Sequence, residues 1–220
     1  MPGMSTLEYV LDKFNLDYKD GNKLPVEIPN FGRDNLAELF AELGFKSGVE
    51  IGVERGLYTE VLCKSNPQVT IYAVDPWEVY KDYRLYVSQR KLDKFYAETM
   101  QRISHYKNGV LIKGFSEDVV KDFDDNSLDF VYIDGNHDFQ HMSHDLFAWS
   151  KKIKVGGIIS GHDYVKNKRL VTNTHVVYVV QSFVQSYRIK PWFLLGTKDE
   201  VPGIIRDSSR SYMWVKPKWA

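Results

Sequence analysis

Cysteine is almost absent from the 220-residue sequence, which contains only Cys63. A single cysteine excludes an intrachain disulfide and a zinc site built from cysteines. No run of about 18 apolar residues is present, so a membrane-spanning helix is not expected. The first residues lack a basic stretch followed by an apolar one, which predicts a cytoplasmic rather than a secreted protein. The 29 basic and 29 acidic residues cancel, which argues against nucleic acid or an anionic membrane as a partner.

The remaining composition is that of a globular chain. Hydrophobic residues make up 43% and charged residues 26% of the sequence, a balance that argues against disorder. The length suits one large domain. We expect an N-terminal extension of a short helix and a loop over residues 1–34, and a single domain over residues 35–220.

Short apolar runs alternate with helical segments from residue 35 onward. This alternation predicts a Rossmann-like, doubly wound α/β sheet of about seven strands with helices on both faces. Segment 176–184 is ambiguous, because its β-branched residues favour a strand while its apolar spacing favours a helix; we interpret it as a helix. The strands are expected at 49–53, 69–74, 110–112, 128–133, 158–160, 192–195 and 212–215. The other helices are expected at 36–43, 57–65, 83–106, 116–123 and 139–153.

Ligands of an open parallel sheet bind beyond the carboxyl ends of its strands. The first such turn contains Glu50, Gly52, Glu54 and Gly56. Its glycines would let a backbone approach a ligand, although a tight structural turn explains them equally well. The dinucleotide pattern G-x-G-x-x-G is missing, and the carboxylate of Glu54 would repel a pyrophosphate. Glu50 favours a ligand with a cationic group.

The next two strand ends carry residues that suit a nucleoside. Asp75 would accept hydrogen bonds from ribose hydroxyls, unless it only prepares the Asp-Pro turn. Trp77 would cover an adenine ring or pack in the interior. Ser116 and Glu117 would contact the edge of the base, and the alternative for Ser116 is a helix N-cap.

The last two strand ends form the densest cluster of carboxylates and imidazoles. Asp134 and His137 follow one strand, and His162 and Asp163 follow the next. Such groups, brought together from adjacent strands, bind divalent metals. A neutral imidazole at His137 would take a proton near pH 7. Carboxylates that end apolar strands, as Asp134 and Asp163 do, need partners.

Neighbouring residues have simpler interpretations. Asp138 is expected to be the N-cap of the helix that follows. His141 and His144 on that helix are expected to be exposed rather than functional. The basic helix 83–106 is expected to cover an acceptor pocket, with tyrosines at its entrance: Tyr80, Tyr83 and Tyr86.

Taken in order, these motifs resemble the class I S-adenosylmethionine-dependent methyltransferases, and within them the small-molecule O-methyltransferases of the macrocin and catechol types. The motifs are Val-Glu50-Ile-Gly52-Val-x-x-Gly56, Asp75, Ile-Asp134-Gly-Asn-His137 and Gly-Gly-Ile-Ile-x-Gly-His162-Asp163-Tyr. The resemblance covers roughly residues 36–164.

The resemblance implies a seven-stranded sheet whose last strand is antiparallel. It implies that Glu50, Gly52 and Gly56 frame the methionine part of the cofactor, and that Asp134 also lies beside it. Asp75 would hold the ribose, with Ser116 and Glu117 near the adenine. In metal-dependent members, the positions of Asp134, His162 and Asp163 bind Mg²⁺, and the position of His137 carries the general base.

This sequence departs from the family in two ways. The first turn lacks G-x-G, and the pair after the fifth strand of the motif region is His-Asp instead of Asp-Asp or Asp-Asn, which leaves a softer metal or no metal open. The resulting hypothesis is O-methylation of a small acceptor, either a sugar or a phenol, by a chain that forms a homodimer. The alternatives are a non-catalytic cofactor-binding subunit and a nucleotide-dependent oxidoreductase.

Overall fold

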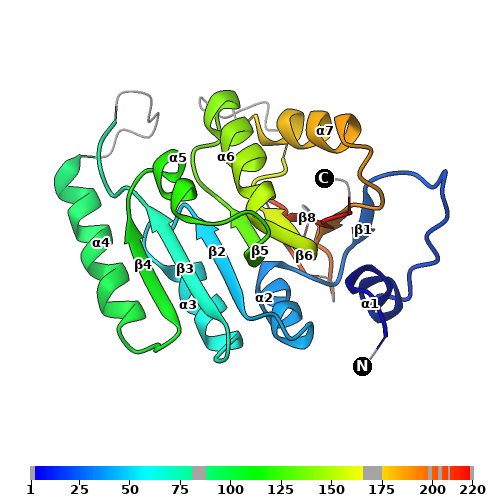
Figure 1. The fold of residues 1–220 in the computed structure, drawn as a ribbon, viewed down its shortest axis with the longest axis horizontal. Helices are drawn as coiled ribbons and strands as arrows, with labels where there is room; N and C mark the ends of the chain where they lie inside the picture. The colour runs from blue at the N-terminus through cyan, green and yellow to red at the C-terminus, as the bar shows by residue number, and fades with distance from the viewer. Residues whose placement is uncertain are drawn as a thin grey trace.

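The computed structural model describes residues 3–80, 88–165, 175–197, 200–202, 205–207 and 209–218. Within these ranges, eight strands form one sheet in the order β1-β7-β8-β6-β5-β2-β3-β4 (Figure 1). Neighbouring strands are parallel, except that β8 runs antiparallel to both β6 and β7. The strands are β1 Val26–Ile28, β2 Ser47–Ile51, β3 Thr70–Asp75, β4 Gly109–Lys113, β5 Leu128–Ile133, β6 Ile153–Gly161, β7 Phe193–Leu195 and β8 Tyr212–Val215.

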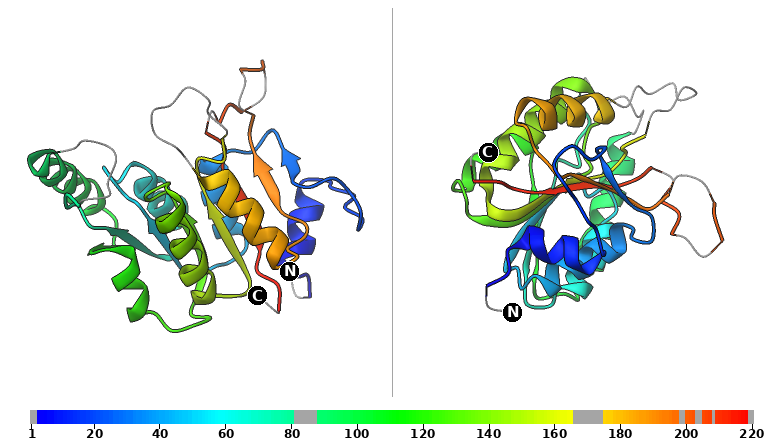
Figure 2. Two further views of the ribbon diagram at one scale, coloured as in Figure 1. Left: turned by 90° about the horizontal axis from the view of Figure 1, so that it is seen from above. Right: turned by 90° about the vertical axis from the view of Figure 1, so that its right-hand side faces the viewer.

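Helices cover both faces of the sheet, which Figure 2 shows edge-on in its right-hand view. One core cluster joins α5, α6 and α7 to the sheet, and a second joins α1, α2 and α3 to the opposite face. Helix α4 is joined to α3 by the ion pair Arg102–Glu60 and to the turn before α3 by the ion pair Arg55–Glu98. The helices are α1 Thr6–Lys13, α2 Arg33–Glu42, α3 Leu57–Ser65, α4 Gln89–Ile103, α5 Ser116–Val119, a 3₁₀ turn Val120–Asp122, α6 Phe139–Lys152 and α7 Val176–Ser186.

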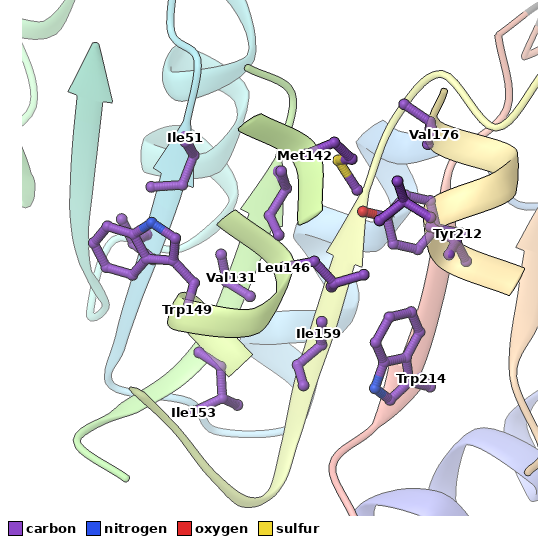
Figure 3. Packing of buried hydrophobic residues seen from close by; sticks show 14 of the residues in the cluster. Ile51, Val131, Met142, Leu146, Trp149, Ile153, Ile159, Val176, Tyr212 and Trp214 are labelled. Atoms are coloured by element: carbon purple, nitrogen blue, oxygen red, sulfur yellow. The ribbon is translucent and has the colours of Figure 1, made fainter. Parts of the chain in front are cut away.

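Helix α6 is positioned by one apolar stripe. Met142, Leu146 and Trp149 recur at helical spacing, are at most 1% exposed, and face the strands of the sheet (Figure 3). The helix begins at an N-cap, Asp138, whose side chain accepts the backbone N–H of His141. Cap and stripe together fix where the loop after β5 ends, and therefore where its polar side chains lie.

The predicted fold class is confirmed, including the antiparallel last strand and the helix at residues 176–186. One strand was missed: β1 lies within residues 1–34 and pairs with β7, so part of the expected extension belongs to the sheet. The domain boundary at residue 35 stays a prediction. Strand β6 begins five residues before the predicted start, since Ile153 already pairs with Leu128.

Two local predictions were wrong. Ser116 is the first residue of α5 and Phe115 is its N-cap, because the serine hydroxyl is engaged with a side chain of α6 instead. The helix predicted at 83–106 corresponds to α4, which ends at Ile103 rather than at residue 106 and whose described part begins at Gln89. Only Leu92 of α4 lines the central cleft. The expectation that this helix covers an acceptor pocket stays a prediction, and residues 83–87 of it lie outside the described residues. None of the described helices has the length and apolar character that crossing a bilayer requires.

Candidate active site

A cleft of about 640 Å³ opens at the carboxyl ends of the central strands. Its walls come from the β2–α3 turn and from the loops after β3, β4 and β5. The sequence-predicted residues that line it are Glu50, Gly52, Asp75, Trp77, Ser116, Glu117, Asp134 and His137. Gly56, His162 and Asp163 are not in the lining. Tyr80 is, whereas Tyr83 and Tyr86 lie outside the described residues.

Gly52 is required by the packing of the first turn. Its φ is +86°, and a Cβ there would lie 2.2 Å from the carbonyl oxygen of Asp134. At Gly56, φ is +71° and a Cβ would lie 2.9 Å from Thr99 Cγ2. Both positions therefore favour glycine before any ligand is considered. The close approach presses the turn after β2 against the loop after β5, which brings Glu50 and Asp134 to the same cleft.

Asp75 organises the first turn as well as its own loop. Its Oδ2 accepts the backbone N–H groups of Val53 and Glu54, each at 3.0 Å, and its Oδ1 accepts that of Trp77 at 2.8 Å. Burial raises the pKa of Asp75, and these three hydrogen bonds oppose the rise only in part. A carboxylate has about four acceptor positions, so roughly one remains for a further donor.

Trp77 borders the cleft but is itself fully buried. The residue is 0% exposed, packs with Val53 and Ala73, and donates its Nε1–H to the carbonyl of Glu54 at 2.7 Å. Its ring therefore supports the turn from beneath. The less buried aromatic rings of this wall belong to Tyr80 and Phe115, which meet edge-to-face at 5.5 Å.

Glu50 is a carboxyl group buried in the floor of the cleft. It is 2% exposed, and its described hydrogen-bond partner is the hydroxyl of Thr59. Burial raises the pKa of Glu50 to about 8, while the bond from Thr59 and the charge of Arg33 act in the opposite direction. The guanidinium of Arg33 lies over the ring of Tyr58 at 5.5 Å and also lines the cleft. A buried acid beside a cation suits a zwitterionic ligand.

The carboxylate and imidazole cluster forms as predicted in space. His137 lies between two carboxylates, with Nδ1 3.1 Å from Asp163 Oδ2 and Nε2 3.3 Å from Asp134 Oδ1. His162 Nδ1 lies 3.8 Å from Asp134 Oδ2 and 3.9 Å from Asp163 Oδ1. Burial lowers the pKa of His137, but Asp134 and Asp163 outweigh it, and the net pKa is raised.

His162 is held by a residue that the sequence did not reveal. Its Nε2 lies 3.2 Å from Asp207 Oδ1, and the other oxygen of Asp207 accepts the backbone N–H and the hydroxyl of Ser211. Burial lowers the pKa of His162, but Asp207 and the nearby carboxylates outweigh burial, and the net pKa is raised. When Nε2–H donates to Asp207, the Nδ1 lone pair faces Asp134 and Asp163. No motif points to Asp207, because it lies in a loop far along the chain.

These groups fit a divalent cation. One ligand atom from each of Asp134, His162 and Asp163 falls within 4.8 Å of the others. A carboxylate that fixes the tautomer of a ligating histidine is the usual outer shell of a metal site. The mixed set of one nitrogen and two carboxylates suits a softer divalent ion at least as well as Mg²⁺. His137 Nε2 is buried without a well-oriented hydrogen bond, although Asp134 is near.

Three other expectations can be compared with the structure. Asp138 caps α6, as expected. His141 is only partly exposed: its Nδ1 lies 2.8 Å from Asp138 Oδ2, and it lines the cleft, so the expectation that it is exposed was wrong. His144 is exposed at the rim. Arg33 and Asp145 line the cleft without any sequence signal having been recognised.

The comparisons with known proteins give a family and a fold. Residues 49–164 match a methyltransferase domain family. No curated protein matches the sequence. An O-methyltransferase from Bacillus cereus, solved with SAH, is similar with a TM-score of 0.58 and 17% identity, over 98% of this chain and 93% of that one.

Two further solved structures have the same fold. The O-methyltransferase TomG from Streptomyces achromogenes, involved in tomaymycin synthesis and solved with SAM, matches with a TM-score of 0.57 and 15% identity, over 84% of this chain and 79% of that one. An rRNA methylase from Streptococcus thermophilus matches with a TM-score of 0.57 and 14% identity, over 84% and 96%. The fold is shared by proteins with different acceptors, so it does not identify the acceptor.

Proposed function

The chain belongs to the methyltransferase domain family, and from this premise we propose that it transfers a methyl group from S-adenosylmethionine to an oxygen of a small hydroxylated acceptor of the sugar or phenol type. The observation that carries the proposal is the convergence of chemically different groups from separate strand ends on one cleft. The cleft is lined by the buried acid Glu50, by Asp75, and by Asp134 and His137 of the acid–histidine cluster.

Each end of the cleft suits one part of the cofactor. Glu50 would receive the α-ammonium group of the methionine part, because a positive charge stabilises the ionised form of a buried carboxyl group. Arg33 would receive the α-carboxylate. Asp75 would accept one ribose hydroxyl at its remaining position, and Ser116 and Glu117 would lie near the base.

Asp134, His162 and Asp163 would hold the divalent cation, Mg²⁺ or a softer ion, and His137 would hold the acceptor's proton. A bound cation would supply Lewis-acid polarisation of the acceptor hydroxyl. His137 Nε2 would then accept the proton, since this atom is buried and lacks a well-oriented partner. A second positive charge near Asp134 and Asp163 would lower the pKa of His137, so that the imidazole is neutral and able to act as a base. Alignment of the acceptor with the sulfonium methyl would supply much of the rate.

Two titrations and one assay test the proposal. Calorimetry with S-adenosylhomocysteine and, separately, with NAD on the purified chain should give binding of the first alone. Binding of NAD alone would support the oxidoreductase alternative. Formation of S-adenosylhomocysteine from S-adenosylmethionine should then appear with a panel of catechols and sugars, in Mg²⁺, Mn²⁺ or EDTA. Cofactor binding without turnover on any acceptor would favour the non-catalytic subunit.

A further inference from the structure

Asp145 is a buried carboxylate that the proposed reaction does not use. It lies on α6 among the residues that face the sheet, three positions after Met142 and four before Trp149, and it is 6% exposed. A charged group on an apolar stripe is costly unless it is fully hydrogen-bonded. Burial raises the pKa of Asp145 to about 6, although the hydrogen bond from Ser116 acts in the opposite direction.

A short chain of hydrogen bonds fixes Asp145 as an acceptor. Trp149 donates its Nε1–H to Ser116 Oγ at 2.7 Å, and Ser116 donates its only hydroxyl hydrogen to Asp145 Oδ1 at 2.5 Å. Because the indole can only donate, the direction of the chain is fixed and it ends at the carboxylate. The packing in Figure 3, where Trp149 lies between α6 and the sheet, anchors the first member of this chain.

The second oxygen of Asp145 is open toward the cleft. Asp145 lines the cleft, and Ser116 is the described residue that donates to its side chain. The position that a Cβ of Gly135 would occupy is 3.5 Å from Asp145 Oδ2, so this glycine leaves the oxygen uncovered. A carboxylate oxygen that opens toward the cleft and has no donor among the described residues is free to accept a hydrogen bond from a ligand.

The residues around Asp145 suit a flat ligand that carries an amino group. Tyr80 and Phe115 provide aromatic walls at this end of the cleft, since Phe115 precedes Ser116 and the Tyr80 ring packs against Phe115 and His141. Ser116 follows β4 three residues after Lys113, which faces Asp75 across β3 and β4. The base of a nucleoside whose ribose is held at Asp75 would therefore reach this slot.

We propose that Asp145 recognises the exocyclic 6-amino group of the cofactor's adenine. Its Oδ2 accepts a hydrogen bond from that group, while Oδ1 accepts the hydroxyl of Ser116, which Trp149 keeps in place. This inference rests on the proposed use of S-adenosylmethionine. A carboxylate cannot donate, so it rejects a base with an oxygen at the 6-position. Asp145 is thus a specificity-determining residue for the cofactor.

The test compares S-adenosylhomocysteine with its 6-oxo analogue, S-inosylhomocysteine, by calorimetry. The wild-type chain should bind the 6-amino ligand more tightly by about tenfold or more, since the 6-oxo ligand leaves two acceptors facing each other. In Asp145→Asn, the amide can accept from Ser116 and donate to the 6-oxo group, so the preference should vanish or reverse. If Asp145 had only a structural role, Asp145→Asn would lower the affinity for both ligands by the same factor.

Two further variants sharpen the result. Asp118→Asn is the matched control, because Asp118 is exposed, pairs with Lys121 and does not line the cleft; it should keep the wild-type preference. Glu117→Gln tests the neighbouring carboxylate, which also lines the cleft, and should change the preference less than Asp145→Asn does. Loss of the preference in Glu117→Gln but not in Asp145→Asn overturns the inference.

The ligand series alone also decides the matter if Asp145→Asn fails to fold. The wild-type chain should then bind the 6-unsubstituted purine analogue more weakly than S-adenosylhomocysteine, and equal binding of all three ligands overturns the inference. A wild-type chain that binds none of them overturns the proposed function, and the inference with it. Binding of S-adenosylhomocysteine with an unchanged preference in Asp145→Asn overturns the inference only.

Discussion

The two ends of strand β5 carry carboxylates in opposite situations. Asp129, near the amino end, accepts the backbone N–H groups of Lys46 at 2.6 Å and Ser47 at 2.9 Å, and the ammonium of Lys154 at 2.7 Å. Asp134, just beyond the carboxyl end, has two histidines as its nearest described cations, at 3.3 and 3.8 Å.

This difference indicates a structural role for the charge of Asp129 and a functional role for that of Asp134. Burial raises the pKa of Asp129, but Lys154 and the two backbone donors outweigh it, so the net pKa lies below the usual value. Fixed donors therefore keep Asp129 ionised and occupy most of its acceptor positions. Asp134 faces groups that can gain or lose a proton, which leaves its charge available to a cation or a substrate.

The largest expected effect is on turnover in Asp134→Asn. Removal of this charge weakens the hold on a cation and the support of His137, so turnover should fall by about a hundredfold or more. The affinity for S-adenosylhomocysteine should change by less than about threefold. Steady-state kinetics and calorimetry on the same preparation measure the two effects, and equal losses in both would count against the role assigned to Asp134.

Asp129→Asn should produce the opposite pattern. The amide accepts fewer hydrogen bonds and no longer balances Lys154, so the free energy of unfolding should drop by about 2 kcal/mol. Turnover at a temperature where the variant is folded should match the wild type. Urea denaturation checks the stability, and a catalytic defect in the folded variant would show that the two ends of β5 are not separate in function.

The sequence predicts β5 and its site residues for a simple reason. The apolar run 128–133 is long enough to identify a strand, and the carboxyl ends of parallel strands share one edge. Strand β1 was missed because its three residues lie between Pro25 and Pro29 and its partner β7 is near the other end of the chain. Helix α7 was ambiguous because its β-branched residues favour a strand, whereas burial of one face decides for a helix.

Residues of the site that do not follow a strand were not recognised. Asp145 carried a usable signal, since it interrupts the stripe of Met142, Leu146 and Trp149 with a charge. Arg33 and Asp207 carried none: one begins α2 and the other lies in the loop before β8, and only tertiary packing brings them near the cleft. Local periodicity predicts elements, whereas these contacts depend on the register of distant strands.

Asp207→Asn tests whether the cluster around Asp134 binds a metal, because it weakens the hydrogen bond that orients His162. An amide holds the Nε2–H of His162 less firmly and no longer supports its ligand orientation, so the affinity for Mn²⁺ should fall about tenfold. Titration of the purified chain with Mn²⁺, followed by electron paramagnetic resonance, measures this effect without turnover. Asp20→Asn is the control, because Asp20 is an exposed partner of Lys190. An unchanged affinity in Asp207→Asn would remove Asp207 from the metal site.

The smallest expected effect concerns Glu50 and pH. The pKa of Glu50 is about 8 in the folded chain, whereas the ordinary value is 4.5. Between these values the folded state keeps a proton that the unfolded chain has lost, so the free energy of unfolding should fall as the pH rises. The raised pKa values of His137 and His162 contribute in the same direction.

Glu50→Gln isolates the contribution of this residue. The slope of unfolding free energy between pH 6 and pH 8 should become shallower than in the wild type by about 1 kcal/mol per pH unit. Saturating S-adenosylhomocysteine should stabilise the wild type more at pH 8 than at pH 6, because its ammonium group favours ionised Glu50. Glu42→Gln, on the exposed side of α2, should retain the wild-type slope. Identical slopes in the wild type and Glu50→Gln would mean that the pKa of Glu50 is not raised in the folded chain. Glu50 would then be ionised at neutral pH, as Asp129 is, and the contrast between the two carboxyl groups would not hold.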